Sequence, residues 1–162
     1  MITRRTQGSI VQLRQFIEQA EKTTLTVGFH ESAKYTDGSP VAMVAAENEF
    51  GVPSRRQPPR PFMRPTIAAK RQEFLDLLGK GSKAALRGQF TLIQVFDQVG
   101  LKVAGEIRRT ISKLTSPALS PRTIQERRLK YASNQQLVGG LTKPLVETGL
   151  MIASVTHEVK ES

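Results

Sequence analysis

The stretch from Val52 to Thr66, VPSRRQPPRPFMRPT, restricts the possible folds more than any other part of this sequence. It holds five of the nine prolines of the 162-residue chain, together with four arginines. Proline fixes the backbone φ angle and has no N–H to donate, so such a stretch forms neither a helix interior nor a central strand. We therefore expect residues 52–66 to form a projecting, proline-rich arm between two helical segments.

Hydrophobic periodicity on both sides of the arm predicts regular structure. Apolar residues at steps of three or four predict helices over residues 9–21, 41–50 and 91–114, and Ser-Pro starts another helix at 120. A further helix begins near residue 64, and Gly79, Gly81 and Gly88 make the part beyond residue 78 either a frayed extension or a hinge. Alternation predicts strands over 23–30 and 153–159, and residues 134–143 have the composition of a loop.

An isolated strand is not stable, so the two predicted strands should share one sheet. We expect a small antiparallel or mixed sheet with the long amphipathic helix packed on it, which is an α+β fold. The whole chain, residues 1–162, is predicted to be a single domain that includes the arm.

Composition and charge limit the class of protein. The chain has no cysteine, and we find neither a signal sequence nor the roughly 18 consecutive apolar residues of a membrane span, so we expect a soluble protein made in the cytoplasm, without membrane contact. The net charge of +10 is uneven: residues 1–51 carry −1, residues 52–88 carry +7 and residues 89–162 carry +4. Such a charge distribution favours nucleic acid or an acidic protein surface as partner.

The sequence contains no recognisable catalytic or metal-binding pattern. His30 and His157 lie near the ends of the two predicted strands and could in principle bind a metal together. No third metal-binding residue stands near either one at a spacing typical of metal sites. The run GKGSKAALRG at 79–88 lacks the spacing of a phosphate-binding loop. No nucleophile has a partner histidine and acid at a known spacing. We therefore expect a protein that is not an enzyme and that needs no cofactor or metal.

Basic side chains on two predicted helices are candidates for contact with DNA: Arg108, Arg109, Lys113, Arg127 and Arg128. The simpler interpretation is a solvated helix face, because the chain has few aromatic residues for stacking and no clear helix-turn-helix spacing. A basic, non-enzymatic nucleic-acid-binding protein is thus an alternative function.

Three stretches together resemble a known group of proteins. They are AAENEFGVPSRRQPPRPFMRP at 45–65, ALSPRTIQERR at 118–128 and KPLVETGLMIASVTHEV at 143–159. In this order, with an amphipathic helix between the first two, they resemble the neck and tail-completion (virion morphogenesis) proteins of tailed bacteriophages. The likeness spans residues 41–160. Met63 stands where leucine is common in that group, and Leu150-Met151 where a more polar pair often follows Thr-Gly.

The resemblance implies a structural virion protein at the head–tail junction, with no catalytic residues. It implies a homo-oligomeric ring, taken as a hexamer, that joins the head connector or adaptor to the tail terminator or tail tube proteins. Non-specific contact with packaged DNA would require only phosphate attraction.

A stiff arm suits such an assembly because it loses little entropy on docking. In a ring the arm would place Phe62 and Met63 as apolar contacts, and Arg55, Arg56, Arg60 and Arg64 as charged contacts, against a neighbouring subunit or partner. The alternative is that the arm wraps its own domain and Phe62 closes the core.

Overall fold

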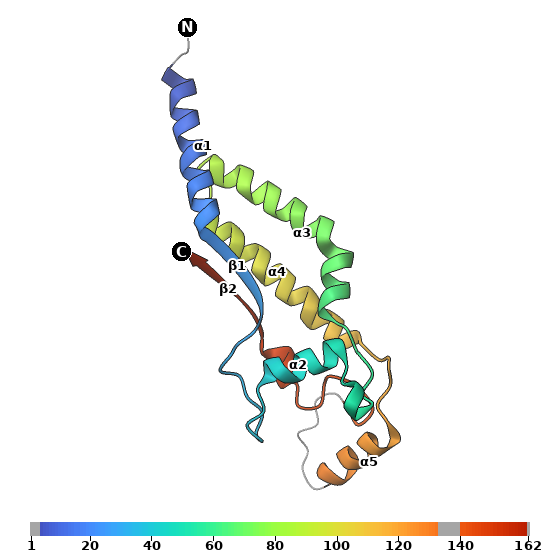
Figure 1. Cartoon of the computed structure of the whole chain (residues 1–162). Helices are drawn as coiled ribbons and strands as arrows, with labels where there is room; N and C mark the ends of the chain where they lie inside the picture. Colours follow the sequence, from blue (N-terminus) through green and yellow to red (C-terminus); the bar gives the residue numbers. More distant parts are fainter. Residues whose placement is uncertain (1–3, 133–139, 162) are drawn as a thin grey trace. The chain divides into compact units, whose positions relative to one another are not determined.

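The computed structural model describes residues 4–132 and 140–161. Within them the order of elements is α1 (Arg4–Lys22), β1 (Thr23–Phe29), α2 (Val41–Phe50), the 3-10 turn η1 (Pro53–Arg55), α3 (Met63–Leu86), α4 (Leu92–Lys113), α5 (Pro121–Lys130), α6 (Leu150–Ala153) and β2 (Val155–Glu161) (Figure 1). The predicted α+β class is confirmed.

The first and last strands pair in a two-stranded antiparallel sheet, as the rule that an isolated strand is unstable predicts. Helix α4 contacts β2 closely. A Cβ atom added at Gly100 of α4 would lie only 2.4 Å from Cδ2 of His157 in β2, so this glycine allows the close approach. His157 Nε2 also lies 2.7 Å from a carboxylate oxygen of Asp97, one turn earlier in α4.

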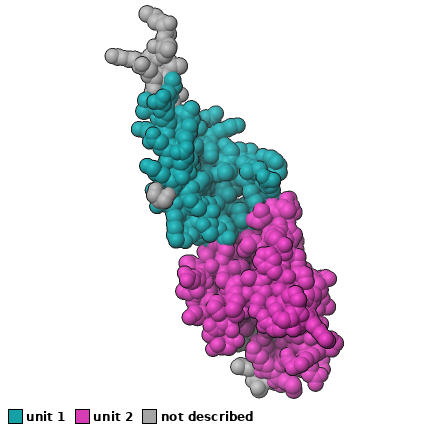
Figure 2. All heavy atoms as spheres, in the orientation of Figure 1, with its two compact units in different colours: residues 1–27, 70–103, 157–162 teal, residues 28–69, 104–156 magenta. Residues whose placement is uncertain are grey.

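The chain divides into two compact units (Figure 2). Unit 1 contains residues 1–27, 70–103 and 157–162, and unit 2 contains residues 28–69 and 104–156. Both units are built from interleaved segments, and α3, α4 and the two strands each contribute residues to both. The single folding domain expected from the sequence therefore stays a prediction.

Each unit has its own buried apolar residues. In unit 1 these are Phe74, Leu92, Val95, Val99 and Val103. In unit 2 they come from six segments of the chain: Val41, Ala45, Phe62, Ala104, Ile107, Ile111, Val146, Met151 and Val155. The period of three or four along α4 thus supplies buried residues to both units.

The structure corrects the sequence interpretation at two places. Helix α3 continues through Gly79 and Gly81 to Leu86, so the glycines are neither a frayed end nor a hinge. A Cβ atom at Gly81 would lie 2.4 Å from Cγ1 of Val95, which identifies this glycine as a packing contact inside unit 1. Ala153, expected in the closing strand, belongs to the short helix α6. The expected loop at 134–143 lies mostly outside the described residues.

Among the described residues, no helix combines the length and apolar character needed to cross a bilayer.

Candidate functional site

The arm at 52–66 is part of unit 2 and packs against other segments of that unit, so it does not project as a whole. Val52 and Gln57 form a small bridge around η1, and α3 starts at Met63. Phe62 is 1% exposed, and its ring meets the ring of Phe29 edge to face, with centroids 6.1 Å apart. The expectation that Phe62 projects as an apolar contact is therefore wrong, and the alternative, in which Phe62 closes the core, describes the structure.

Glu49, near the end of α2, fixes the start of α3. Its carboxylate accepts hydrogen bonds from the backbone N–H groups of Phe62 (2.8 Å), Met63 (2.9 Å) and Arg64 (3.0 Å), and from Nε of Arg64 (3.0 Å). The first N–H groups of a helix have no partner inside the helix, and a carboxylate there also meets the positive end of the helix dipole. Burial alone would raise the pKa of Glu49, but the hydrogen bonds from Met63, Phe62 and Arg64 outweigh it and hold the pKa below its usual value.

Arg60 ties the arm to the segment before α5. Its backbone N–H donates to the carbonyl of Asn48 at 2.6 Å. Its guanidinium donates from Nε to the carbonyl of Pro117 (2.8 Å) and from Nη2 to that of Ala118 (2.9 Å). Arg60 is only 6% exposed, so this residue, expected as a charged contact for a partner, makes its contacts inside unit 2.

The other arm residues remain at the surface. Arg55 is exposed and pairs with Glu47, and Arg56 is exposed in a left-handed conformation with φ of 53°. Met63 is half-buried. The guanidinium of Arg64 lies 4.6 Å from the centre of the exposed ring of Phe50. Contact of these four residues with a partner stays a prediction.

The five candidate DNA-facing residues have different environments. Arg108 donates to the carbonyl of Val155, and Arg109 is exposed but pairs with the buried Glu106 at 3.2 Å. Arg127 is 7% exposed. Lys113 and Arg128 are exposed. One of the five is therefore buried and a second is held by an internal hydrogen bond, which leaves less charge for phosphate contact than the sequence indicated.

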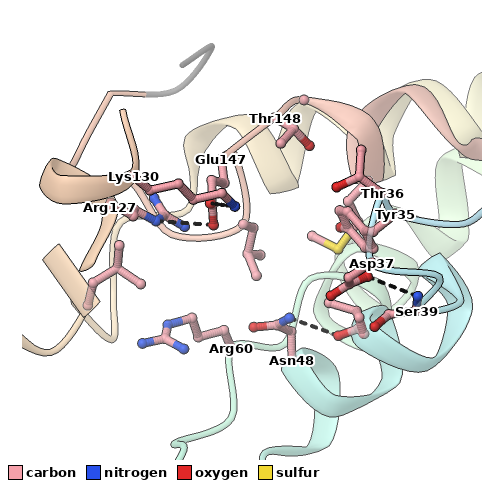
Figure 3. Close-up of a pocket in the computed structure, with 15 residues that line it drawn as sticks. Tyr35, Thr36, Asp37, Ser39, Asn48, Arg60, Arg127, Lys130, Glu147 and Thr148 are labelled. Carbon is pink, nitrogen blue, oxygen red and sulfur yellow. Dashed lines mark hydrogen bonds and ion pairs between the residues drawn. The ribbon is translucent and has the colours of Figure 1, made fainter. Parts of the chain in front are cut away.

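Unit 2 contains a cavity of about 490 Å³ that the sequence did not indicate (Figure 3). Its lining residues come from the turn before α2, from α2, the arm, α5 and the segment up to α6: Tyr35, Thr36, Asp37, Ser39, Val44, Asn48, Arg60, Leu119, Arg127, Lys130, Leu145, Glu147, Thr148, Gly149 and Met151. The labelled polar side chains surround the cavity, with Arg60 and Arg127 on one side and Asp37 and Ser39 on the other.

Glu147 is the centre of the charged contacts in this cavity. Its carboxylate accepts from Nζ of Lys130 at 3.0 Å and from the hydroxyl of Tyr131 at 2.8 Å, and it lies 3.4 Å from Nε of Arg127. Burial would raise the pKa of Glu147, but these donors and the charge of Arg127 lower it below its usual value. The hydrogen bond to Glu147 in turn raises the pKa of Lys130. Both groups are therefore charged near neutral pH.

Arg127 makes one side-chain hydrogen bond, to Lys143, and one ion pair, with Glu147. Its Nη1 donates to the carbonyl of Lys143 at 2.9 Å. Its Nε is close to Glu147 but makes no hydrogen bond, and it is the one buried side-chain nitrogen or oxygen without such a partner among the residues that the structure describes. Burial, and next the charge of Arg127, lower the pKa of Arg60. The two guanidinium groups thus act on each other as like charges.

Three contributors to this region were missed at the sequence level. Glu49 and Glu147 stand inside two of the quoted stretches, but their partners at Phe62 and Arg127 are 13 and 20 positions away, which matches no local pattern. Tyr35, whose pKa is raised by burial and by the charges of Glu147 and Asp37, precedes the Asp-Gly turn. Tyr35 is one of only two tyrosines in the chain, and this rarity is the single signal that could have drawn attention to it.

Comparison with protein-family models, with curated proteins and with solved structures found no match to this chain. Among the described residues, no group of three or more metal-ligating side chains lies close enough together to hold a metal ion.

Proposed function

We propose that this chain is a structural virion protein of a tailed phage, a neck or tail-completion component that assembles as a ring and joins the head connector to the tail. Its mechanism would be assembly, without catalysis, at the head–tail junction of the virion. The proposal rests on the three quoted stretches and on two features of the structure.

The first supporting feature is that the three stretches contact one another inside unit 2. Arg60 of the first stretch donates to the carbonyl of Ala118, where the second begins. Arg127 of the second donates to the carbonyl of Lys143, where the third begins. In the first of these contacts, Arg60 and Ala118 are 58 positions apart along the chain, so the contact joins distant parts of the sequence. Such contacts are a physical reason for the three stretches to occur together.

The observation that carries the ring is the exposed apolar face of α1. Ile10, Leu13 and Ile17 recur at the spacing of one helix face, yet all three, with Val11, are between 46% and 53% exposed. An amphipathic helix normally buries this face, and a contiguous exposed apolar surface is typical of an interaction site. A second copy of the chain is the partner that a ring provides, because each subunit of a ring meets the next through a different surface.

The alternative, a nucleic-acid-binding protein, receives less support from the structure. Arg127 is buried, Arg108 is bonded to a backbone carbonyl and Arg109 is paired with Glu106. Binding that depends on phosphate contacts needs accessible cations, and of the five candidates Lys113 and Arg128 fit this need best.

The test is the assembly state of the purified full chain at high salt, by negative-stain electron microscopy and light scattering. We expect rings with a central hole, and we expect the double variant Ile10→Glu/Ile17→Glu to remain monomeric because it places two charges in the apolar contact. The matched control, Gln12→Glu/Gln15→Glu, adds the same charges to α1 without removing apolar surface and should still form rings. Circular dichroism of both variants checks whether they keep their helices.

Two results would contradict the proposal. Rings that form equally well in both variants would show that the α1 face is not the contact. Monomers of the unaltered chain at every concentration, together with duplex DNA binding that falls steeply with salt, would favour the nucleic-acid alternative.

A further inference from the structure

The cavity of unit 2 contains a buried positive charge that no nearby carboxylate compensates. Arg60 is 6% exposed and its guanidinium donates only to the neutral carbonyl oxygens of Pro117 and Ala118. In the part of the chain that the structure describes, no carboxylate forms an ion pair with it. A buried charge is costly unless an opposite charge lies close by, so the site is electrostatically incomplete.

The second guanidinium of the cavity is also incompletely bonded. Arg127 is 7% exposed, and its Nε makes no hydrogen bond within the described residues. The carboxylate of Glu147 is near, but it already accepts from Lys130 and from the hydroxyl of Tyr131. Glu147 thus accepts two hydrogen bonds and forms an ion pair with Arg127 at 3.4 Å, and none of these contacts reaches Arg60.

The remaining acidic group of the cavity does not change this balance. Asp37 is exposed and its carboxylate accepts from the backbone N–H of Ser39 at 2.9 Å. Hydrogen bonds from Ser39 lower the pKa of Asp37, so it is charged, but Figure 3 shows it on the side of the cavity opposite Arg60 and Arg127. The cavity lining thus carries three cations, Arg60, Arg127 and Lys130, against two carboxylates. Glu147 forms ion pairs with Lys130 and Arg127, so the uncompensated charge is that of Arg60.

We propose that this cavity binds an oxyanion, a phosphate or a carboxylate group, at the guanidinium groups of Arg60 and Arg127. Guanidinium presents paired N–H donors that match the oxygens of both groups. The lining also offers the ammonium of Lys130 and the hydroxyl of Tyr35 as further donors. This site is independent of the ring assembly proposed above.

The size of the cavity and the burial of its guanidinium groups limit which kinds of molecule could bring an oxyanion to this site. A cavity of about 490 Å³ falls within the size range of small-molecule sites. Side chains that are 6% and 7% exposed are out of reach of the backbone of a DNA duplex, which needs cations at the surface. The oxyanion therefore arrives as a small molecule or on a side chain that enters the cavity.

The experiment measures binding of inorganic phosphate and of acetate to the full chain by isothermal titration calorimetry, with sodium chloride keeping the ionic strength constant. We expect saturable binding of at least one probe, and Arg60→Met should weaken it about tenfold or more, as loss of a charge-assisted hydrogen bond does. The matched control is Arg122→Met, which removes an arginine of α5 that is 88% exposed and should leave binding unchanged.

The two probes distinguish the sources. Binding of phosphate but not acetate would assign a phosphate group, and binding of acetate with equal or greater affinity would assign a carboxylate. If Arg60→Met does not fold, Lys130→Gln takes its place, because it removes an ammonium that lines the cavity from an exposed position. Absence of saturable binding by either probe would overturn the proposal, and so would an equal loss of binding in Arg122→Met.

Discussion

Glu49 and Arg60 are both buried charged residues of unit 2, and their surroundings differ in kind. Glu49 receives four hydrogen bonds, three from backbone N–H groups at the start of α3 and one from a guanidinium. Arg60 donates to two backbone carbonyls and has no opposite charge beside it among the described residues. The fold compensates the charge of Glu49 with hydrogen bonds and a guanidinium, whereas among the described residues it offers Arg60 only neutral acceptors.

This difference separates a structural role from a binding role. A buried charge whose hydrogen bonds are all made inside the protein stabilises one conformation. A buried charge that the fold leaves uncompensated costs free energy, and such a cost is typical of sites that a ligand completes. Removing Glu49 should therefore lower the stability of the fold much more than removing Arg60.

The largest expected effect is that of Glu49→Ala. The change leaves the N–H groups of Phe62, Met63 and Arg64 without their acceptor, and each buried donor left unpaired costs about 1–3 kcal/mol. We expect the free energy of unfolding to fall by about 3 kcal/mol or more, measured by urea denaturation. The control is Glu47→Gln, two positions earlier in α2, which removes an exposed pair with Arg55 and should cost less than about 1 kcal/mol. Similar losses in the two variants would remove the special role of Glu49.

Much of the fold follows from patterns that are visible in the sequence. The period of α4 was readable because Val99, Val103, Ile107 and Ile111 all face the interior, so the burial that stabilises the helix also produces the pattern. The first strand could be predicted for the same reason, because buried and exposed side chains alternate along the first half of β1. Gly81 was misinterpreted because its reason, a close approach to Val95, lies in another helix.

The site was much less predictable. A segment rich in proline and arginine has the composition of an exposed arm, and burial of Arg60 depends on Pro117 and Ala118, which are 57 and 58 positions away. Local composition carries no information about such partners. The same holds for Glu49, whose two neighbours in the sequence, Asn48 and Phe50, give no sign that its carboxylate caps a helix that starts 14 positions later.

A smaller effect is expected for Arg60→Met in chloride buffer. The variant loses two hydrogen bonds to carbonyls but also removes a buried charge without a counter-ion, and the two changes oppose each other. We expect a loss of at most about 2 kcal/mol by urea denaturation, against about 0.5 kcal/mol or less for the exposed control Arg122→Met. In the buffer of whichever oxyanion binds, the gap between Arg60→Met and the unaltered chain should widen, because only the unaltered chain gains from binding. A loss in chloride as large as that of Glu49→Ala would mean that the fold depends equally on both charges, and the contrast between them would fail.

The smallest expected effect is the pH dependence that Glu49 contributes. Its pKa in the folded chain lies below the ordinary value of 4.5, so at pH values between the two the unfolded chain binds more protons than the folded one. The stabilisation by Glu49 is therefore complete above pH 4.5 and is lost as the pH falls through the folded pKa. Other carboxylates with a lowered pKa also contribute to the pH dependence of the whole chain. Among them is Glu73, whose pKa is lowered to about 2 by hydrogen bonds from Lys102 and Lys70.

Subtracting the urea-denaturation curve of Glu49→Gln from that of the unaltered chain, at a series of pH values from 7 to 3, isolates the contribution of Glu49. Added salt should weaken the contribution of the exposed Glu73 but leave that of the buried Glu49 nearly unchanged, because screening acts mainly on exposed charges. A difference curve that is flat with pH would show that the carboxylate of Glu49 is no better placed in the folded chain than in water, and its contrast with Arg60 would lose its basis.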